Sequence, residues 1–389
     1  MTGIKLAFVT QFPIDVNKPL GGVEAVSVNL VRSLSEYQDL DIHIVTLCPE
    51  TFQNTKTCWQ GVVVHRLPKP TGSELLNAIT QSKRLISDYI EKLQPDLIHA
   101  HDTYGIMVQD LNIAKVFTVH GFIYGDTLLA GGKFKWLRSK LWEYIEKKSW
   151  SKQPNIISIS PYVRERISSV SPANIYDIDN PISDSFFSVP RQEVSNTIFT
   201  SAVICPRKNS LQLIKAVSIL VAKGYDIELR IAGSVSDQDY AQRQLAWVKE
   251  HKLENNVQFL GRISTQQVMQ ELSTASIYAL TSLEENSPMG IEEAMAVGVP
   301  VITSNRCGMP YMVKNSETGY LINPFDEKNI ADKIQIILDN KKLKLDMESK
   351  SKLIAAESYH SKKVAERTYF VYEEINKKAL NNKSKLEKL

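Results

Sequence analysis

Seven residues separate two glutamates, Glu285 and Glu293, in the segment Glu-Asn-Ser-Pro-Met-Gly-Ile-Glu-Glu. A strand-like run, Ile277–Thr281, precedes this segment, and a short helix-like stretch follows it. A strand, a loop and a helix N-terminus in that order present free backbone N–H groups and the positive end of a helix dipole, which attract anions. Glutamates beside such a site predict a phosphorylated, sugar-like ligand, whose hydroxyls need acceptors while its phosphates need donors.

Two cations, Arg207 and Lys208, follow the first strand-like run of the second half of the chain and stand at a helix start. Cations at that place oppose the helix dipole, so we expect an anion to compensate them. A diphosphate would do so, with Arg207 as a fork and Lys208 as a point charge. The alternative is a solvated pair of loop residues.

Glycines stand at several strand ends, where they permit positive φ and close backbone approach. Gly21 and Gly22 open a helix after the first strand and could cradle an acceptor or a phosphate, or simply form a tight turn. Gly233 and the run Gly261-Arg262-Ile263 could approach a nucleotide through their backbone. Each motif is weak alone, and none is a GxGxxG or Walker sequence.

A histidine, His120, ends the fifth strand-like run, where it can donate to a sugar hydroxyl or to a developing charge. A structural histidine is the alternative. His99 and His101 lie on another strand and are expected to point to opposite faces, so at most one should face the ligand. For these two we favour a structural role.

Short apolar runs alternate with amphipathic helical patterns along the whole chain, which predicts parallel sheets with right-handed crossovers. The expected strands are Leu6–Thr10, Ile42–Leu47, Val62–Leu67, Leu97–Ala100, Val116–Val119, Ile156–Ile159, Ile198–Ile204, Ile227–Ala232, Val257–Leu260, Ile277–Leu280, Val301–Thr303 and Tyr320–Ile322. Periodicity is lost around Asn180–Phe187. We therefore expect two doubly wound α/β domains, with ligands beyond the carboxyl ends of the strands.

Composition supports this organisation. A chain of 389 residues, 43% of them hydrophobic, is comfortable for two domains. Its 46 basic and 43 acidic residues nearly balance, which does not argue for nucleic acid. Four scattered cysteines, without a CxxC motif, disfavour a zinc site or a disulfide framework and fit the cytoplasm. With neither a signal-peptide pattern nor a bilayer-spanning apolar run, a cytoplasmic protein is expected.

The segment 133–150 mixes three tryptophans with an excess of basic residues. A basic aromatic helix can lie in a membrane interface and meet a lipid-linked acceptor, which would place the protein peripherally at the inner membrane face. The alternative is an ordinary surface helix that packs Leu137, Leu141 and Ile145 inward.

These motifs, taken in order, resemble the retaining nucleotide-sugar glycosyltransferases of family 4. The resemblance spans nearly the whole chain, and its most specific part is the glutamate pair followed by Ala294–Val301. It also includes the glycine pair, Thr118–Gly121, Pro206–Asn209, Gly261–Ser264 and Glu317–Tyr320. It implies the GT-B fold, in which two Rossmann-like domains face each other across a cleft and the C-terminal helix crosses back to the first domain. The expected limits are 1–183 with 362–389 for an acceptor-binding domain, and 184–361 for a donor-binding domain.

The resemblance also implies roles for single residues. Glu293 would bind the ribose of the donor, Glu285 would lie near the transferred sugar, and Arg207 and Lys208 would hold the diphosphate. The catalytic set is then His120, Arg207, Lys208 and Glu285, with His120 contacting the donor sugar from the other domain. The donor-binding set is Gly22, Gly233, Arg262, Ile263, Ser287, Pro288, Met289, Gly290, Ile291 and Glu293, and the acceptor-binding set is Gly21 and Gly22. Glu284 and Glu292 have the same spacing, but the second glutamate of the family directly precedes Ala-Met.

The expected reaction moves a sugar from a nucleotide-diphosphate sugar to a hydroxyl of a glycan or lipid-linked acceptor, with retention of configuration. The expected setting is the synthesis of a surface polysaccharide or glycoconjugate. No cofactor or metal is expected, although Asp177-Ile178-Asp179 and Asp237-Gln238-Asp239 match the Asp-x-Asp of metal-dependent transferases. A glycosidase pair of carboxylates would have little use for the two cations. A nucleotide-sugar epimerase and a non-catalytic sugar-nucleotide binding protein remain alternatives.

Overall fold

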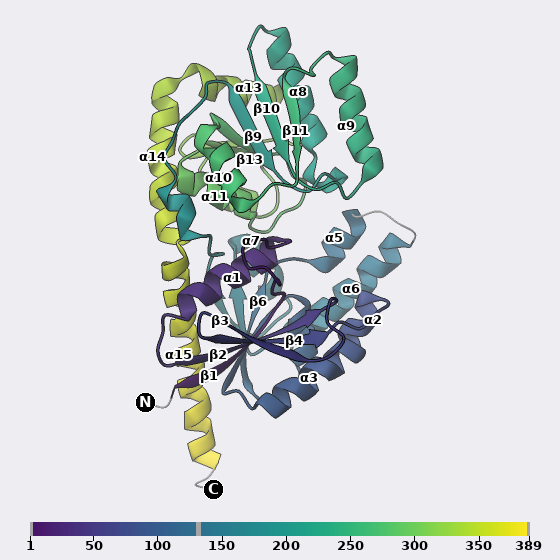
Figure 1. Ribbon diagram of the computed structural model, residues 1–389, viewed down its shortest axis with the longest axis vertical. Helices are drawn as coiled ribbons and strands as arrows, with labels where there is room; N and C mark the ends of the chain where they lie inside the picture. The colour runs from purple at the N-terminus through teal and green to yellow at the C-terminus, as the bar shows by residue number, and fades with distance from the viewer. Residues whose placement is uncertain (1–2, 130–133, 387–389) are drawn as a thin grey trace. The chain divides into compact units, whose positions relative to one another are not determined.

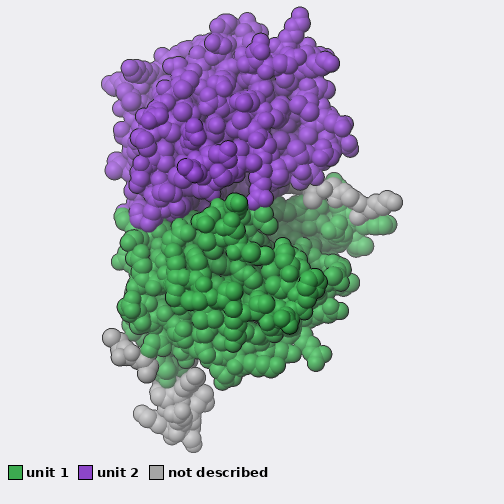
Figure 2. All heavy atoms as spheres, in the orientation of Figure 1, with its two compact units in different colours: residues 1–128, 132–181, 361–389 green, residues 129–131, 182–360 purple. Residues whose placement is uncertain are grey.

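A computed structural model describes residues 3–129 and 134–386 and divides the chain into two compact units (Figure 1). Unit 1 comprises residues 1–128, 132–181 and 361–389, and the body of unit 2 is residues 182–360 (Figure 2). The expected domain limits lie between residues 183 and 184 and between residues 361 and 362. Residues 1–2, 130–133 and 387–389, which the expected first domain includes, lie outside the described residues.

Unit 1 is built on an eight-stranded sheet with the order β3-β4-β2-β1-β5-β6-β7-β8. All neighbouring strands are parallel except β3 and β4. The strands are β1 (Ile4–Val9), β2 (Leu40–Cys48), β3 (Thr55–Trp59), β4 (Val62–Pro68), β5 (Leu97–His101), β6 (Ala114–Val119), β7 (Asn155–Ser158) and β8 (Asn174–Asp177). The chain order reverses between β1 and β5, which makes that point the switch point of the sheet.

Helices cover both faces of this sheet and bury two apolar clusters. The helices of unit 1 are α1 (Gly22–Leu34), α2 (Glu74–Ile79), α3 (Gln81–Leu93), α4 (Thr103–Val108), α5 (Ile123–Leu129), α6 (Lys135–Trp150), α7 (Pro161–Ser168) and α15 (Ser361–Leu386). Strands covered on both faces are apolar almost throughout, as β1 illustrates, with five of its six residues buried.

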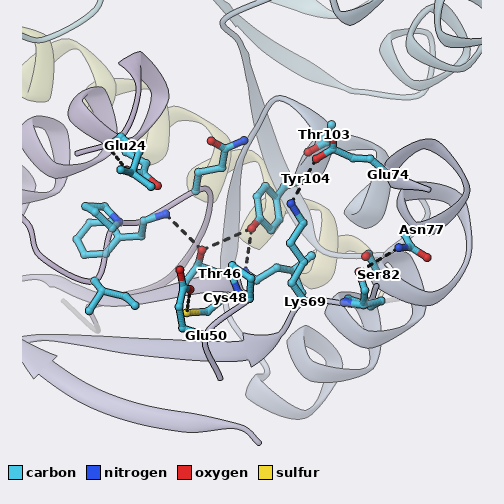
Figure 3. A pocket seen from close by; sticks show the side chains of 18 of the residues that line it. Glu24, Thr46, Cys48, Glu50, Lys69, Glu74, Asn77, Ser82, Thr103 and Tyr104 are labelled. Atoms are coloured by element: carbon cyan, nitrogen blue, oxygen red, sulfur yellow. Dashed lines mark hydrogen bonds and ion pairs between the residues drawn. The ribbon is translucent and has the colours of Figure 1, made fainter. Parts of the chain in front are cut away.

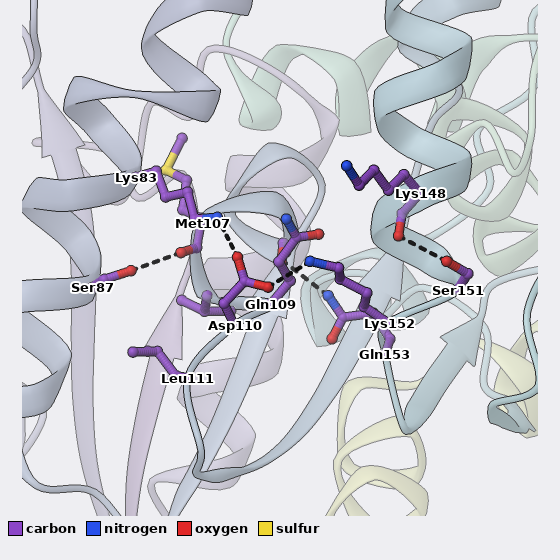
Figure 4. Close-up of polar contacts among 12 residues, drawn as sticks. Lys83, Ser87, Met107, Gln109, Asp110, Leu111, Lys148, Ser151, Lys152 and Gln153 are labelled. Carbon is purple, nitrogen blue, oxygen red and sulfur yellow. Dashed lines mark hydrogen bonds and ion pairs between the residues drawn. The ribbon is translucent and has the colours of Figure 1, made fainter.

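In unit 1, polar contacts join helices and helix ends that are distant in sequence (Figure 4). Asp110 follows α4 and forms ion pairs with Lys83 of α3 and with Lys152, 2.7 Å away, just after α6. Hydrogen bonds from both lysines lower the pKa of Asp110 to about 2. Gln153 donates to the carbonyl of Gly105 over 3.0 Å, which ties the end of α6 to α4.

Unit 2 is built on a six-stranded parallel sheet with the order β11-β10-β9-β12-β13-β14. Its strands are β9 (Thr197–Ser201), β10 (Glu228–Ala232), β11 (Val257–Gly261), β12 (Ile277–Leu280), β13 (Val301–Ser304) and β14 (Gly319–Ile322). In chain order this is the 3-2-1-4-5-6 arrangement of dinucleotide-binding folds, with its switch point between β9 and β12.

Two apolar clusters cover the faces of the second sheet. The helices of unit 2 are η1 (Asp184–Ser188), η2 (Pro206–Lys208), α8 (Ser210–Ala222), α9 (Gln238–Glu250), α10 (Thr265–Thr274), α11 (Met289–Val297), α12 (Met309–Met312), α13 (Glu327–Asp339) and α14 (Lys341–Ser358), where η marks a 3-10 helix. The prediction of two Rossmann-like α/β domains is therefore confirmed.

The expected return of the C-terminal helix is also confirmed, because α15 is part of unit 1 and packs along α1. Three side chains of its apolar stripe, Val364, Val371 and Tyr372, are each at most 2% exposed. Ser361 at its start bonds to Ser33 of α1 over 2.6 Å. The helix ends at Leu386, so the expected residues 387–389 lie outside the described part of the chain.

The inward packing expected for the aromatic helix is wrong for two of three residues. Leu137 is 61% exposed and Leu141 is 46% exposed, whereas Ile145 is 9% exposed. Trp142 and Trp150 form the buried side of α6 instead, because they lie eight residues apart and therefore on one face of the helix.

Candidate donor site

The two predicted cations lie directly beyond the switch point of unit 2. Arg207 and Lys208 occupy the short turn η2, and Asn209 adopts a left-handed conformation with a φ of 54° before α8 begins. Both side chains are largely buried, with 25% and 15% of the side chain exposed. The alternative interpretation, a solvated pair of loop residues, is therefore wrong.

The anion that compensates these cations within the chain is Glu285. Its carboxylate forms an ion pair with Lys208 and another with Arg207 over 3.4 Å. Burial pushes the pKa of Glu285 upward, but Lys208 and then Arg207 hold it below its ordinary value. Both cations thus contact the same carboxylate, that of Glu285.

Backbone contacts fix the loop that carries Glu285. Arg207 donates from Nη1 to the carbonyl of Glu284 over 2.8 Å, and the Leu283 N–H donates to the Arg207 carbonyl over 2.8 Å. From the loop after β13, the Gly308 N–H donates to the Glu285 carbonyl over 2.8 Å. A Cβ on Gly308 would lie 1.8 Å from the Asn286 carbonyl oxygen, so only glycine fits there. The sequence analysis did not identify Gly308; its only signal was a position beyond a strand end.

Glu293 lies in α11, in the same unit as the two cations. It has no hydrogen-bond or ion-pair partner among the described residues, and burial raises its pKa to about 8. Both Glu293 and Glu285 act electrostatically on the Tyr278 hydroxyl, which places the two carboxylates around this one group. An unpaired carboxylate that is partly buried is costly unless a ligand completes its hydrogen bonds.

Tyr278 of β12 forms the floor between these carboxylates, and the sequence analysis missed it. Its hydroxyl is 3.2 Å from the Ser201 Oγ at the end of β9. A Cβ on Gly290 would lie 2.1 Å from the Tyr278 hydroxyl and 3.3 Å from the Ser201 Oγ. Gly290 therefore lets the first turn of α11 lie directly on this floor.

The competing pair of glutamates has different surroundings. Glu292 is fully buried, and its Oε1 accepts a hydrogen bond from the Ser287 Oγ over 2.8 Å. Pro288 is the N-cap of α11, so Met289, Gly290 and Ile291 form its first turn. Glu292 therefore contacts its own loop through Ser287, and the choice of Glu285 and Glu293 as the ligand-binding pair stays a prediction.

Two other predicted positions lie at neighbouring strand ends. Gly233 has a φ of 151°, and a Cβ there would lie 1.9 Å from the Ala202 carbonyl oxygen. Its N–H donates to the Gly261 carbonyl over 2.8 Å, which joins two of the predicted turns. Arg262 is exposed, and Ile263 packs on the apolar cluster under α11. Their donor contacts stay predictions.

The glycine pair in unit 1 differs from its expected conformation. Gly21 is the extended N-cap of α1, with a φ of −158°, and Gly22 is the first helical residue. Neither has the positive φ that we invoked. A Cβ on Gly21 would meet nothing within 4 Å, so neither backbone geometry nor packing requires glycine there. The expected contact of this pair with acceptor or phosphate stays a prediction.

His120 directly follows β6 in unit 1 and forms contacts within that unit. Its N–H donates to Asp102 over 3.0 Å, and its Nε2 is 2.7 Å from the His101 Nδ1. Burial lowers the pKa of His120, although Asp102 and Asn180 oppose this effect. This shift favours the neutral form of the ring, and the expected contact of His120 with a sugar stays a prediction.

The expected opposite orientation of His99 and His101 is wrong. Their ring centroids lie 4.3 Å apart, because residues two apart on a strand share a face. His99 lies between the Tyr372 hydroxyl, 2.6 Å away, and the Thr118 hydroxyl, 2.7 Å away. Both histidines are buried, which agrees with the structural role that we favoured.

One aspartate of each Asp-x-Asp sequence has a structural contact. Asp237 caps α9 by accepting from the Tyr240 N–H over 2.8 Å, and Asp177 pairs with Arg164 over 2.5 Å. Burial raises the pKa of Asp179 to about 6. In residues 3–129 and 134–386, no three histidine, cysteine or acidic side chains are grouped so that they could hold a metal ion.

Two family models match the chain and together span residues 20–353. The model described as Glycosyltransferase Family 4 matches residues 20–186, and the model described as Glycosyl transferases group 1 matches residues 182–353. An uncharacterized glycosyltransferase from Haemophilus influenzae is 25% identical over 89% of this chain and 94% of its own length. One from Methanocaldococcus jannaschii is 22% identical over 84% of this chain and 87% of its own length.

Solved structures share the whole architecture. Sucrose-phosphate synthase from Thermosynechococcus elongatus superimposes with a TM-score of 0.78 at 19% identity, over 96% of this chain and 99% of that one. An Anabaena protein solved in complex with UDP-glucose has a TM-score of 0.71 at 17% identity, over 95% of this chain and 100% of that one. In the described part of the chain, no helix is both long and apolar enough to span a bilayer.

Proposed function

Since the chain belongs to the GT-B glycosyltransferases of the family 4 and group 1 type, we propose that it transfers a hexose from a nucleotide-diphosphate sugar to a hydroxyl of a glycan or lipid-linked acceptor. The proposed reaction retains the anomeric configuration and needs no metal. The proposed setting is the synthesis of a surface polysaccharide or another glycoconjugate.

The observation that carries this proposal is the charge cluster at the switch point of unit 2. Arg207 and Lys208 both contact the carboxylate of Glu285 in a largely buried place, where two cations can face a diphosphate. Glu293, which has no hydrogen-bond or ion-pair partner among the described residues, acts with Glu285 on the Tyr278 hydroxyl and offers acceptors to ribose hydroxyls. The Anabaena neighbour was solved with UDP-glucose, which supports a nucleotide sugar as the ligand.

Negative charge develops on the departing diphosphate as the bond to the sugar breaks, while the sugar ring becomes positive. Glu285 holds both Arg207 and Lys208 before the reaction, and the Glu284 carbonyl also accepts from Arg207, so the two cations stabilise this charge without reorganising. We propose that these cations replace the metal ion that other transferases use. Attack on the same face as the leaving diphosphate would account for retention.

A donor screen tests the proposal. Nucleotide-diphosphate sugars with uridine, guanosine, adenosine and thymidine bases are added to the full chain, and the unfolding midpoint is measured. We expect one base to raise the midpoint with increasing concentration, because a ligand at 100 times its Kd stabilises by about 2.7 kcal/mol. The best donor is then incubated with candidate acceptors with and without EDTA, and NMR identifies the anomer formed.

Each alternative predicts a different outcome. Conversion of the donor to an epimer, without release of nucleotide diphosphate, would indicate an epimerase. Binding without turnover by any acceptor or by water would indicate a binding protein. Loss of turnover in EDTA, or an inverted product, would contradict the proposed metal independence or retention.

We further propose that α6 brings unit 1 to an anionic membrane surface. Phe134, Trp136 and Tyr144 are 78%, 66% and 62% exposed, and Leu137 and Leu141 are exposed beside them. The basic side chains Lys135, Arg138, Lys140 and Lys148 are exposed on the same helix. Exposed aromatic and basic groups on one helix fit the boundary between lipid headgroups and acyl chains.

Vesicle cosedimentation tests this surface. The protein should sediment with vesicles of phosphatidylcholine and phosphatidylglycerol and much less with phosphatidylcholine alone. The double variant Trp136→Ser and Leu137→Ser should lose most of this binding. Leu353→Ser, which changes a leucine of α14 in unit 2 that is 73% exposed, is the control. Equal sedimentation of wild type and double variant would contradict the proposal.

A further inference from the structure

The His120 loop, residues 120–124, joins the end of β6 to the first turn of α5. Two carboxylates from different elements accept hydrogen bonds from four of its five backbone N–H groups. Asp102, which lies between β5 and α4, binds the first half of the loop, and Glu146 of α6 binds the second half. All of these residues belong to unit 1, so the contacts are internal to that unit.

The first half of the loop is bound by Asp102. Its Oδ1 accepts from the His120 N–H over 3.0 Å, and the Gly121 N–H also donates to this carboxylate. Asp102 is the N-cap of α4, yet its side chain forms no capping hydrogen bond with that helix. Its φ of 45° and ψ of −125° form a combination that residues with a side chain rarely adopt. Such a conformation persists only where other contacts stabilise it, and the two bonds to the loop are contacts of this kind.

The second half of the loop is bound by Glu146. Its Oε1 accepts from the Ile123 N–H over 3.1 Å, and its Oε2 accepts from the Tyr124 N–H over 3.0 Å. Glu146 is only 4% exposed, so water does not compete for these bonds. The Ser139 hydroxyl, also of α6, donates to the Tyr124 carbonyl over 2.7 Å. Two bonds from one carboxylate fix both the position and the direction of the first turn of α5.

The space beside the two carboxylates has no room for a ligand. Asp102 and Glu146 line the same void of about 10 Å³, which holds one water molecule at most. The large cavity of unit 1, about 570 Å³, is lined instead by Thr103 and Tyr104, which directly follow Asp102 (Figure 3). Neither carboxylate lines that cavity. Glu146 therefore acts on the loop and not on a molecule in the cavity.

The strength with which Glu146 binds the loop depends on its protonation. Burial raises the pKa of Glu146 to about 8, and the Tyr124 and Ile123 N–H groups oppose this shift. Asp102 and Asp126 of α5 raise the pKa as well. Because the two N–H groups lower the pKa, they bind the ionised carboxylate more strongly than the protonated one. The hydrogen bonds to the second half of the loop therefore strengthen as pH rises through about 8.

Three other titratable groups at the loop keep their charge in this pH range. Burial raises the pKa of the Tyr124 phenol, and burial lowers the pKa of His120. Arg166 of α7 donates to the Tyr124 hydroxyl over 2.5 Å and lies 5.1 Å from the centroid of the Phe122 ring. Tyrosine with a raised pKa, histidine with a lowered one and arginine do not titrate between pH 7 and 9.

We propose that Glu146 is a positioning residue, which holds the His120 loop together with Asp102 and so fixes the His120 ring before the donor sugar binds. The inference rests on the proposed function, because only a sugar at His120 gives this contact a part in the reaction. A ring on a fixed loop needs no further ordering when the substrate binds, and a misplacement of about 1 Å can lower turnover about 100-fold. Turnover thereby acquires a pH dependence from a residue that touches no substrate.

NMR of the full chain with nitrogen-15 in its histidine rings tests the contact without requiring turnover. The variant His120→Asn identifies the His120 signals among those of the seven histidines. In the wild type these signals should shift with a midpoint of about pH 8. In Glu146→Gln this transition should be absent, because glutamine does not ionise. Glu143→Gln, which changes a carboxylate of α6 that pairs with Lys140 and Lys147, is the matched control and should titrate as wild type.

Turnover is the second measurement. Glu146→Gln should lower kcat at saturating donor by about tenfold to 100-fold. The donor KM should stay within a few-fold of wild type, because Arg207 and Lys208 belong to unit 2. Ser139→Ala removes an uncharged contact of α6 with the loop and should keep the transition near pH 8. If Glu146→Gln does not fold, the transition in wild type and in Ser139→Ala decides the question.

The outcomes separate this inference from the proposed function. The inference is overturned if the His120 signals show no transition near pH 8, if Glu146→Gln keeps that transition, or if Glu143→Gln abolishes it too. The thermal-shift response to nucleotide sugars is measured on the same samples and depends on unit 2. A normal donor response without the transition rejects the positioning role and leaves the transferase proposal intact. The expected transition without any donor response rejects the proposed function, and with it the part of Glu146 in catalysis.

Discussion

Replacing Arg207 by alanine is expected to lower the turnover number at saturating donor by about 100-fold to 1,000-fold, the usual effect of removing one preorganised donor from a developing charge. The fold should survive, because Glu285 keeps its ion pair with Lys208. Initial rates of nucleotide release, measured over a range of donor concentrations, check the prediction.

A surface arginine variant is the control for this result, and a second variant of the cluster is compared with it. Arg84→Ala removes an arginine whose side chain is 86% exposed on α3, and it should leave turnover unchanged. Lys208→Ala should also lose turnover, but it should lower the unfolding midpoint more than Arg207→Ala does, because Glu285 keeps only the longer contact to Arg207. Turnover of Arg207→Ala within a few-fold of wild type would refute the phosphate role of this cluster.

The sequence predicted several residues of the candidate donor site, but it did not predict the contacts between them. Arg207, Lys208 and Glu285 were expected near one ligand because each follows a strand of one parallel sheet, and the structure brings them into contact. Their mutual ion pairs were not expected, because spacing along the chain does not show which loop reaches across. Tyr278 and Gly308 were missed for the same reason: a buried strand tyrosine and a loop glycine have no distinctive local pattern.

The fold shows a similar limit. Twelve expected strands correspond to strands of the two sheets, because runs buried on both faces are apolar throughout. The edge strands β3 and β8 were missed, since every residue of β3 and β8 is partly or fully exposed. Leu137 and Leu141 were placed inward from periodicity alone, but the large side chains of Trp142 and Trp150 decide which side of α6 is buried.

Glu293→Gln is expected to stabilise the free protein above neutral pH. Burial raises the pKa of Glu293 from 4.5 to about 8, so the folded state holds a proton that the unfolded chain releases. Between pH 4.5 and about pH 8 the free energy of unfolding of the wild type falls as pH rises. Above about pH 8 the carboxylate is ionised in both states, so the destabilisation stays constant. The glutamine has no proton to lose. Its unfolding midpoint should therefore exceed that of wild type at pH 9, and the difference should vanish below the unfolded pKa.

The same substitution should weaken donor binding. Hydroxyls of the ribose that donate to an ionised Glu293 lower its pKa, so the wild type should release a proton on binding below about pH 8. Its affinity should then rise up to tenfold per pH unit until that value. Glu293→Gln should bind roughly ten- to a hundredfold more weakly at high pH, because a charge-assisted hydrogen bond becomes a neutral one.

Titration calorimetry with the best nucleotide sugar checks both effects. A nucleotide sugar is the right probe, because its esterified phosphates have no proton to lose in the neutral range. Repeating the titration in two buffers of different ionisation enthalpy counts the protons released. Glu250→Gln, which changes an exposed glutamate of α9, should behave as wild type throughout. If Glu293→Gln bound as tightly as wild type, with the same pH dependence, Glu293 would have no contact with the donor, and its high pKa would be a cost without a function.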